Sequence, residues 1–314
     1  MKYYNLNGNK ISRLGFGCMR FKTIDGDNGK IDKEESSKIM LKAIDLGLTY
    51  IDTAYPYHDG MSEKFLGEFV KENNLREKIT LTSKLPCWLV KEKDDFYKLF
   101  NEQLANLNTD YLDFYMLHSL DIKRFRQMVD LGALDFLDEI KEKGKAFHIG
   151  FSFHDEFESF EEIIKAYHWD FCQIQLNYLD INYQAGLKGY ELAKEMGIPV
   201  IVMEPVKGGR LANPPEEVRE ILAKFTDLSP AQEALKFPLS LDNVMTVLSG
   251  MNDIKQVKEN IEIASLVAYN SLTDDDINFY EKSRNIYKSR EKIACTACEY
   301  CLPCTVDILS LIHI

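Results

Sequence analysis

Leu14-Gly15-Phe16-Gly17-Cys18-Met19-Arg20 contains the first of eight short apolar runs along this 314-residue chain. The runs alternate with stretches whose apolar residues repeat at helical spacing, a pattern that indicates repeated βα units. Such units build either an open doubly wound sheet or a closed barrel. A dinucleotide-binding open sheet carries Gly-x-Gly-x-x-Gly after its first strand, and this stretch lacks the third glycine. The sequence therefore favours an α/β fold of the (β/α)8 TIM-barrel type.

The expected elements follow this alternation along the chain. The expected strands are residues 14–18, 50–54, 79–84, 112–117, 147–151, 171–176, 200–203 and 244–248. The expected helices are residues 34–46, 62–71, 95–107, 125–143, 157–167, 187–196 and 254–265. Glycines suited to a left-handed helix end follow three of these helices, at Gly47, Gly144 and Gly197. Residues 1–12, with turn formers at 7–9, predict an N-terminal β-hairpin that caps the barrel floor.

The composition excludes several classes of protein. With 45% hydrophobic and 28% charged residues the chain can form a large core and a hydrated surface, so disordered, collagen-like and coiled-coil structures are excluded. Its 38 basic and 50 acidic residues give a net charge of −12, which argues against nucleic-acid or membrane-surface binding. It has no apolar run of about 20 residues and no signal-peptide core, so we expect a cytoplasmic protein.

Four polar residues fall at or just after consecutive strand ends, where barrel enzymes place their chemistry. They are Asp52, Tyr57 in the loop that follows, Lys84 and His118. Each alone has an ordinary structural explanation, but their joint occurrence is harder to explain that way. An ammonium beside a tyrosine lowers the pKa of the phenol from its usual value near 10, and a carboxylate makes burial of that ammonium tolerable. A neutral histidine could then donate a hydrogen bond to a substrate carbonyl.

The same stretches carry a family resemblance. Asp52-Thr53-Ala54 with Tyr57, the strand ending at Lys84, and residues 110–118 (DYLDFYMLH) together resemble the motifs of the aldo-keto reductase superfamily. The resemblance covers about residues 10–270. It implies a barrel that binds an extended nicotinamide cofactor and reduces carbonyls to alcohols, with Asp52, Tyr57, Lys84 and His118 as the catalytic tetrad.

The resemblance also implies residues for the nicotinamide end of the cofactor. Gly150-Phe151-Ser152 resembles the family's GxSN segment, so Ser152 would hold the carboxamide, while Phe153 replaces the expected asparagine. Gln173 matches the family's carboxamide-binding glutamine. Gln175 points to the same strand face, so it remains an alternative, as does a purely structural polar layer.

Two further segments correspond to the rest of the cofactor site. In residues 202–209, Met203 stands where the family often has a stacking aromatic, and Pro205, Gly208 and Gly209 are expected to contact the cofactor.

The adenosine end corresponds to residues 249–260. Glu259 and Asn260 match the family's adenine-binding pair. Gln256 stands where an arginine usually grips the 2′-phosphate of NADP, and Gly250 replaces a family lysine, although Lys255 or Lys258 could compensate. The cofactor is therefore expected to be NADP or NAD.

Four of the seven cysteines form a separate pattern near the end of the chain, Cys295, Cys298, Cys301 and Cys304. Their C-x2-C-x2-C-x2-C spacing matches the start of a bacterial ferredoxin run, so we expect them to bind a 4Fe-4S cluster rather than zinc. Reactive cysteines without metal are the remaining interpretation. The other three, Cys18, Cys87 and Cys172, are expected to pack as small apolar residues.

One subgroup of aldo-keto reductases resembles this chain throughout, because its barrel is followed by a C-terminal ferredoxin-like domain. Here Thr305 replaces a proline of that motif, and no second cysteine motif follows. We expect a barrel at 1–272, a helical connector at 273–290 and a partial ferredoxin-like segment at 291–314, of which 309–314 resemble a cloning artefact.

The function expected from these features is NAD(P)-dependent reduction of an aldehyde, ketone or quinone, with Tyr57 as the proton donor. The iron–sulfur module would relay electrons to a partner or brace the tail. The alternative is a nicotinamide-sensing regulatory or electron-transfer subunit without carbonyl turnover, against which the intact tetrad argues. Trp88, Phe153 and Met203 are expected to line an apolar substrate pocket.

Overall fold

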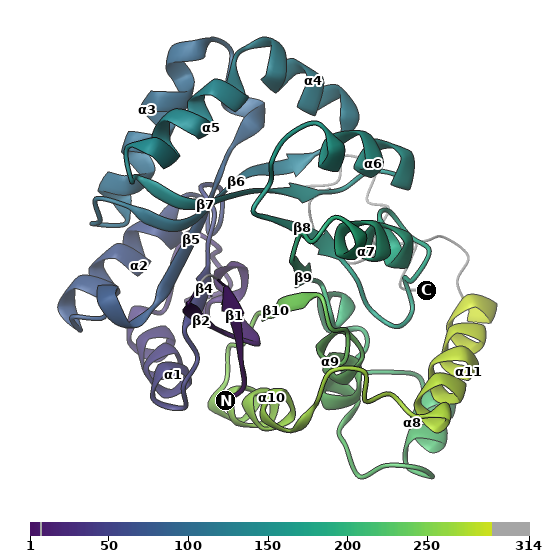
Figure 1. Cartoon of the computed structure of the whole chain (residues 1–314). Helices are drawn as coiled ribbons and strands as arrows, with labels where there is room; N and C mark the ends of the chain where they lie inside the picture. Colours follow the sequence, from purple (N-terminus) through teal and green to yellow (C-terminus); the bar gives the residue numbers. More distant parts are fainter. Residues whose placement is uncertain (7, 291–314) are drawn as a thin grey trace.

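A closed barrel of parallel strands forms the centre of the computed structural model, which describes residues 1–6 and 8–290. Neighbouring strands follow the order β10-β3-β4-β5-β6-β7-β8-β9 (Figure 1). The predicted (β/α)8 barrel is therefore confirmed, and the open doubly wound sheet is excluded. The strands are β3 (Leu14–Gly17), β4 (Tyr50–Asp52), β5 (Thr80–Leu85), β6 (Leu112–Leu120), β7 (Ala146–Phe153), β8 (Phe171–Gln175), β9 (Val200–Met203) and β10 (Val244–Ser249).

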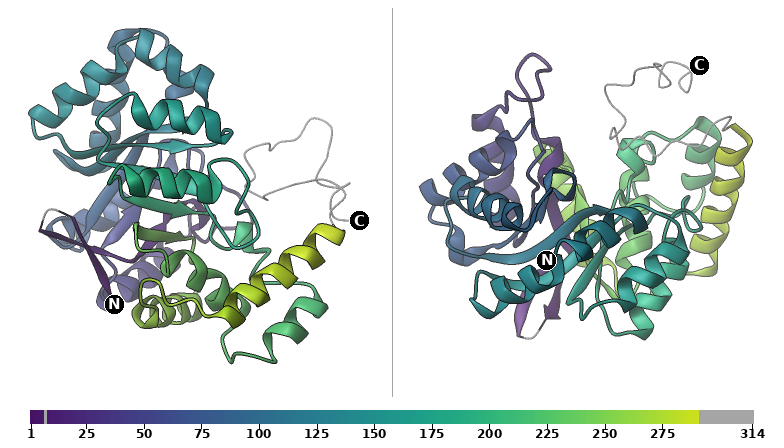
Figure 2. Two further views of the ribbon diagram at one scale, coloured as in Figure 1. Left: turned by 45° about the vertical axis from the view of Figure 1, so that its right-hand side comes forward. Right: turned by 90° about the horizontal axis from the view of Figure 1, so that it is seen from above.

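Helices surround the barrel on its outside (Figure 2). The α-helices are α1 (Lys33–Asp45), α2 (Met61–Glu72), α3 (Lys93–Asn106), α4 (Ile122–Asp130), α5 (Ala133–Glu142), α6 (Phe157–Lys165), α7 (Gly186–Glu195), α8 (Glu216–Leu222), α9 (Pro230–Leu239), α10 (Ile254–Leu266) and α11 (Asp274–Arg290). Short 3-10 turns are η1 (Cys18–Arg20), η2 (Arg76–Lys78), η3 (Cys87–Leu89) and η4 (Lys207–Gly209).

The structure differs from the expected helices in two places. The single helix expected at 125–143 is two helices, α4 and α5, because Gly132 has a φ of 90° and breaks the helical path between them. Helices α8 and α9 were not predicted, and Pro238 lies inside the second of them. The left-handed glycines expected after helices are confirmed at Gly47, Gly144 and Gly197.

The predicted N-terminal hairpin is also confirmed. Strands β1 (Tyr3–Leu6) and β2 (Asn9–Ser12) pair antiparallel. Ile11, 1% exposed, belongs to the same buried cluster as Tyr50, Phe114 and Met245 from the barrel strands. The hairpin thereby covers the end of the barrel opposite the carboxyl ends of the strands, leaving those ends for chemistry.

Helix α11 packs on the barrel beside α8 (Figure 1). The Tyr280 hydroxyl donates to Glu233 Oε1 of α9 at 2.7 Å, and Arg284 donates to the Tyr178 carbonyl at 2.8 Å. Buried aromatic rings therefore fix this helix to the barrel. The cysteines expected to hold a cluster lie at 295–304, outside the described residues. Within the described part, Cys18, Cys87 and Cys172 are buried free thiols, and no helix is both long and apolar enough to span a membrane.

The crossing of α2 and α3 depends on one glycine. A Cβ placed on Gly67 of α2 would lie 2.3 Å from the carbonyl oxygen of Asn106 and 2.7 Å from the carbonyl carbon of Leu107. These are backbone atoms of the end of α3, so they cannot move aside as a flexible side chain could. Gly67 thus sets how closely the two helices approach.

We predict that Gly67→Ala destabilises the protein by about 1–3 kcal/mol, because overpacking outweighs the roughly 1 kcal/mol gain in helix propensity. Urea unfolding followed by circular dichroism measures this change. Lys64→Ala, at an exposed position of the same helix, serves as the control and should change stability by less than about 0.5 kcal/mol. Equal stability of the Gly67 variant and the native protein would contradict the close approach.

Candidate active site

A buried ammonium joins three of the predicted tetrad positions. Lys84 Nζ lies 2.5 Å from Asp52 Oδ1, 2.8 Å from the Thr53 carbonyl oxygen and 3.3 Å from the Tyr57 hydroxyl. The Lys84 side chain is 0% exposed, and these contacts use all three of its donors. Burial raises the pKa of Asp52, and the Lys84 ammonium acts in the opposite direction. The structure thus brings Asp52, Tyr57 and Lys84 together as the sequence predicted.

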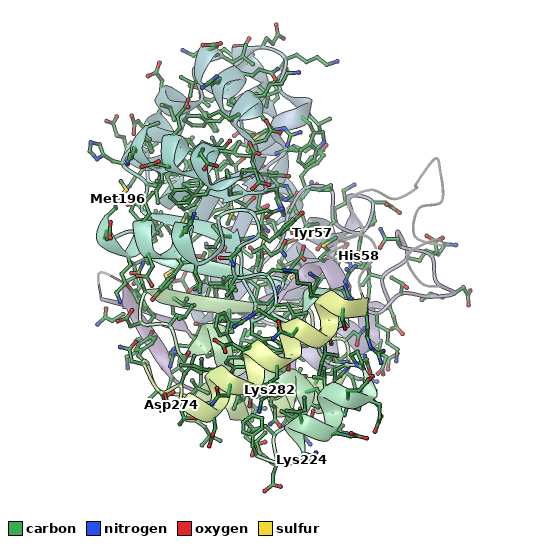
Figure 3. The ribbon with its side chains drawn as sticks, turned by 90° about the vertical axis from the view of Figure 1, so that its right-hand side faces the viewer. Tyr57, His58, Met196, Lys224, Asp274 and Lys282 are labelled. Atoms are coloured by element: carbon green, nitrogen blue, oxygen red, sulfur yellow. The ribbon has the colours of Figure 1, made fainter. Side chains whose placement is uncertain are left out.

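The loop after β4 places the Tyr57 ring. Tyr57 is followed by His58, Asp59 and Gly60, which all have left-handed φ values of 53° to 81°. Figure 3 shows Tyr57 and His58 next to each other. His58 Nε2 accepts the Phe21 N–H at 3.1 Å, so Nδ1 is the nitrogen that donates to the Asn28 carbonyl at 3.0 Å. This strained loop is therefore tied to the segment after β3, which fixes the direction of Tyr57.

His118 lies beside the same group of residues. Its ring centroid is 6.1 Å from that of Tyr57 and 5.3 Å from that of Trp88. Burial lowers the pKa of His118 well below 6.5, and the nearby charges of Lys84 and Arg124 act in the same direction. The imidazole is consequently neutral at physiological pH and can donate one hydrogen bond.

Two residues near His118 were missed by the sequence analysis. Arg124, in the first turn of α4, donates to the Ser119 carbonyl. Its charge acts to lower the pKa values of both His118 and His154. Burial lowers the pKa of His154 to about 4. Arg124 lies on a helix and gives no such signal in the sequence, whereas His154 directly follows β7 and fits the strand-end pattern that found the tetrad.

A cavity of about 370 Å³ opens beside Tyr57 at the carboxyl ends of the strands. It is lined by nine of the predicted catalytic and cofactor-binding residues, namely Asp52, Tyr57, Gln173, Pro205, Gly208, Gly209, Gln256, Glu259 and Asn260. Lys84, His118 and Ser152 are not among its lining residues. The Ser152 hydroxyl accepts the Ser119 N–H at 2.7 Å, so in this structure it supports the turn after His118.

The two glutamines on β8 have different surroundings. Gln173 lines the cavity, and its Nε2 lies 3.5 Å from Met203 Sδ. Its Oε1 is buried with no hydrogen-bond partner in the described part of the chain. Gln175 instead donates to Asp180 Oδ2 at 3.0 Å. An unpaired buried acceptor at the edge of a cavity suits a ligand carrying an amide donor, which fits a nicotinamide carboxamide at Gln173.

A strained loop after β9 forms one wall of this cavity. Glu204, Lys207, Gly208 and Gly209 all have left-handed φ values, and a Cβ on Gly209 would meet no atom within 4 Å. The open space at Gly209 fits close approach of an extended ligand.

An ion pair that the sequence analysis missed holds this loop. Lys207 Nζ lies 2.6 and 2.7 Å from the two oxygens of Asp180, and Lys207 is only 4% exposed. Asn177 donates to Asp180 at 3.1 Å and to the Glu204 carbonyl at 3.2 Å. Burial and the charge of Asp180 raise the pKa of Glu204 to about 7. Lys207 and Asp180 are 27 residues apart in the chain, which is why the pattern around Gly208 did not reveal their pairing.

The far end of the cavity carries amides and a carboxylate. Gln256 Oε1 accepts the Asn252 N–H at 3.0 Å, and Asn260 Nδ2 donates to Ser249 Oγ at 3.1 Å. Lys255 is 81% exposed and faces Glu259 at 3.6 Å. Neither Lys255 nor Lys258 lines the cavity.

Arg20 of η1 also contributes to the cavity. It lines the cavity, and its stem packs over Gly250, where an added Cβ would lie 2.7 Å from Arg20 Cγ. The Arg20 charge also acts to lower the pKa of Glu204. Among the residues that line the cavity, the cation therefore comes from η1 rather than from the segment after β10.

One expected pocket residue lies elsewhere. Phe153 is 0% exposed and packs against Phe160 of α6, because it alternates with Ser152 along β7 and faces the helices. The expectation that Phe153 lines the substrate pocket was wrong. Met203 lines the cavity, and Trp88 is 42% exposed beside His118.

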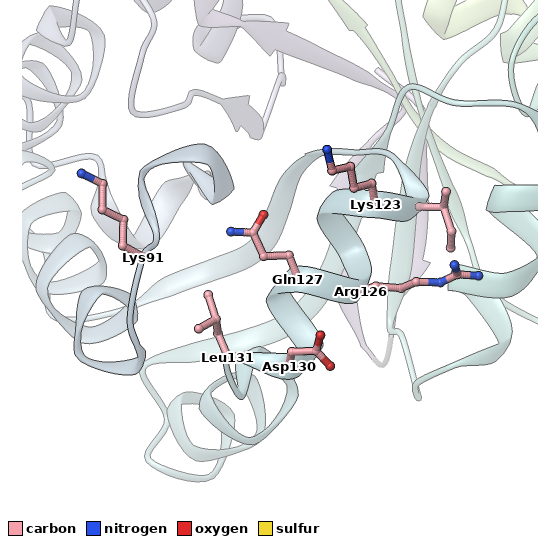
Figure 4. Close-up of a pocket in the computed structure, with 7 residues that line it drawn as sticks. Lys91, Lys123, Arg126, Gln127, Asp130 and Leu131 are labelled. Carbon is pink, nitrogen blue, oxygen red and sulfur yellow. The ribbon is translucent and has the colours of Figure 1, made fainter.

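A second hollow lies outside the barrel, between the segment after η3 and α4 (Figure 4). Its basic residues are Lys91, Lys123 and Arg126, but Arg126 forms a two-contact ion pair with Glu162. No tetrad residue lines it. Within the described residues, no group of three or more His, Cys, Asp or Glu side chains is arranged to hold a metal ion.

Comparison with known proteins identifies the family to which this chain belongs. Residues 13–282 match the model of the aldo/keto reductase family. The uncharacterized oxidoreductase YqkF of Bacillus subtilis is 26% identical, over 89% of this chain and 95% of its own. The NADH-specific methylglyoxal reductase of Escherichia coli is also 26% identical, over 85% and 92%. The holo structure of aldo-keto reductase AKR11C1 from Bacillus halodurans superposes with a TM-score of 0.75 at 27% identity, over 90% and 96%. The chain therefore belongs to the aldo/keto reductase family and is an NAD(P)H-dependent oxidoreductase.

Proposed function

We propose that this protein reduces an aldehyde, ketone or quinone to the corresponding alcohol, with Tyr57 as the proton donor. The observation that carries the proposal is the buried Lys84 ammonium, which contacts both Asp52 and the Tyr57 hydroxyl. A tyrosine beside a buried ammonium can release its proton more readily than a free phenol. A lysine held in this way has no evident use in a protein that only binds a nucleotide.

The residues divide the chemistry between them. When bound, NAD(P)H would supply the hydride that the carbonyl carbon receives. The Tyr57 hydroxyl delivers a proton to the carbonyl oxygen, and Lys84 stabilises the phenolate that remains. Neutral His118 donates a hydrogen bond to the same oxygen, which orients the carbonyl and stabilises the developing negative charge. Asp52 keeps the ammonium in place.

The cavity residues would hold the cofactor along its length. The unpaired Gln173 oxygen is suited to the carboxamide, with Met203 against the nicotinamide ring. Pro205, Gly208 and Gly209 form the wall on which the pyrophosphate would lie, and Arg20 lines the same cavity. Gln256, Glu259 and Asn260 would surround the adenosine. Ser152 would support the nicotinamide end through the turn after His118.

Replacing Tyr57 by Phe tests the proposed chemistry. We expect kcat to fall by about 100-fold or more, because general acid catalysis contributes 10²–10⁴, while NAD(P)H binding measured by fluorescence stays nearly unchanged. Tyr55→Phe is the matched control in the same loop, since its hydroxyl contacts Glu102 and not Lys84. The substrate panel should contain aldehydes, ketones and quinones. A Tyr57→Phe variant with native turnover would refute Tyr57 as the donor.

We propose further that the enzyme uses NADH at least as well as NADPH. Gln256 is neutral and Glu259 is acidic at the end of the cavity that would receive a 2′-phosphate. Gln256→Arg should raise kcat/KM for NADPH about 10-fold and leave that for NADH nearly constant, because a guanidinium forms charge-assisted bonds with phosphate. Gln256→Leu controls for loss of the Asn252 contact. A strong native preference for NADPH would contradict this proposal.

We also propose that Cys295, Cys298, Cys301 and Cys304 bind a 4Fe-4S cluster that exchanges electrons with a partner, on the strength of their spacing alone. Anaerobically prepared protein should contain about four iron and four acid-labile sulfide atoms per chain, and Cys298→Ser should lose most of them. Tyr57→Phe should retain them. Stoichiometric zinc without sulfide would overturn this part of the proposal.

A further inference from the structure

A buried glutamate outside the tetrad lies behind the catalytic lysine. Glu63, in the first turn of α2, is 1% exposed. Its Oε1 accepts from Ser83 Oγ at 2.6 Å and from Gln103 Nε2 at 2.7 Å. Burial raises the pKa of Glu63, while its hydrogen bonds from Ser83 and Gln103 act in the opposite direction. A carboxyl group placed so deep with only neutral donors around it calls for a reason.

The backbone beside Lys84 gives that reason. Strand β4 ends at Asp52, whose register partner on β5 is Thr82, and the Thr53 N–H donates to the Thr82 carbonyl. Backbone groups of alternate residues point to the same side of a strand, so the Lys84 carbonyl points toward β4 beyond its end. Gln103 Nε2 of α3 donates to that carbonyl at 3.0 Å. The Gln103 side chain thus supplies the hydrogen bond to the Lys84 carbonyl that a longer β4 would have supplied.

Glu63 is what orients this side chain. Gln103 Nε2 lies within 3.0 Å of Glu63 Oε1, Ser83 Oγ and the Lys84 carbonyl, which share its two hydrogens, while its Oε1 accepts from the Tyr115 hydroxyl at 2.8 Å. Gln103 is 0% exposed, so no water can take over from Glu63 as acceptor without opening the core. Removing the acceptor would free the amide to turn away from Lys84.

The same turn of α2 also holds the other side of the site. The Ser62 N–H donates to the Tyr57 carbonyl at 3.2 Å, and Ser62 Oγ lies 2.8 Å from Thr53 Oγ1. The Thr53 carbonyl is itself a ligand of the Lys84 ammonium. Ser62 therefore links Tyr57 to Thr53, while the neighbouring Glu63 reaches Lys84 through Gln103.

We propose that Glu63 is a positioning residue for proton transfer, which acts through Gln103 to fix the Lys84 ammonium between Asp52 and the Tyr57 hydroxyl. This inference rests on the proposed function of Tyr57 and adds to it a residue that does not touch substrate or cofactor. It also assigns proton transfer and cofactor binding to different sets of residues. Glu63 affects proton transfer from Tyr57, whereas the residues that line the cavity beyond Tyr57 affect cofactor binding.

Glu63→Leu removes the acceptor and tests the proposal. We expect kcat to fall at least 10-fold, and the alkaline inflection of the kcat profile to move by half a pH unit or more. The dissociation constant for NAD(P)H should stay within about twofold. Glu63→Gln keeps an acceptor oxygen of the same shape and should retain kcat within about threefold. A Glu63→Leu variant with native kcat and pH profile overturns the proposal.

The control for simple loss of stability is Glu233→Leu, the same substitution at a 0% exposed glutamate in the first turn of α9. Glu233 accepts from Tyr280 and contacts no tetrad residue in the described structure. If Glu63→Leu fails to fold, Gln103→Met removes the donor to Lys84 and should reproduce the kinetic effect. Equal loss of kcat in the Glu63 and Glu233 variants, at equal folded fraction, overturns the positioning role.

A measurement without substrate distinguishes failure of this inference from failure of the proposed function. The ionisation of Tyr57 is followed by ultraviolet difference titration, with each protein compared against its own Tyr57→Phe form. The titration midpoint should shift between native protein and Glu63→Leu and return in Glu63→Gln. An unchanged midpoint overturns the inference, even where carbonyl turnover is established. A shifted midpoint without any carbonyl turnover supports the inference and removes the proposed reaction.

Discussion

Burial of the Lys84 ammonium is the constraint around which the site is organised. Moving such a charge out of water costs several kcal/mol, and only good partners in a fixed geometry offset the cost. Asp52, the Thr53 carbonyl and the Tyr57 hydroxyl supply those partners from β4 and the loop that follows it. The ammonium is consequently tolerated in the core only when these three partners are in place.

Strain in two loops follows from the same requirement for fixed geometry. Left-handed residues after Tyr57 and around Lys207 turn the chain back toward the cavity, and each loop is held by a buried side chain. His58 ties the first loop to the segment after β3, and the Lys207–Asp180 ion pair ties the second to the segment after β8. The flexible parts of a barrel are its loops, yet these two loops beside the cavity are anchored.

Sequence patterns predicted the barrel and the tetrad because both depend on local, repeating features. Strands alternate with amphipathic helices, Asp52 ends β4, and Lys84 and His118 lie one and two residues before the ends of β5 and β6. The patterns failed where a residue acts through a distant partner. Arg124, Lys207 and Glu63 are ordinary charged residues of helices or loops in the sequence, and only the fold shows what they contact. Phe153 was misplaced because the motif resemblance at residues 150–153 does not say which side of β7 a residue faces.

The packing of Arg20 over Gly250 couples two segments at opposite ends of the barrel sequence. The arginine stem occupies the space that any larger residue at 250 needs. A substitution at either position therefore affects the packing of the other. A lysine introduced at 250 to copy other members of the family would first have to displace this stem. Within this lineage we expect the two positions to change together, and redesign of the cofactor site has to treat them as one unit.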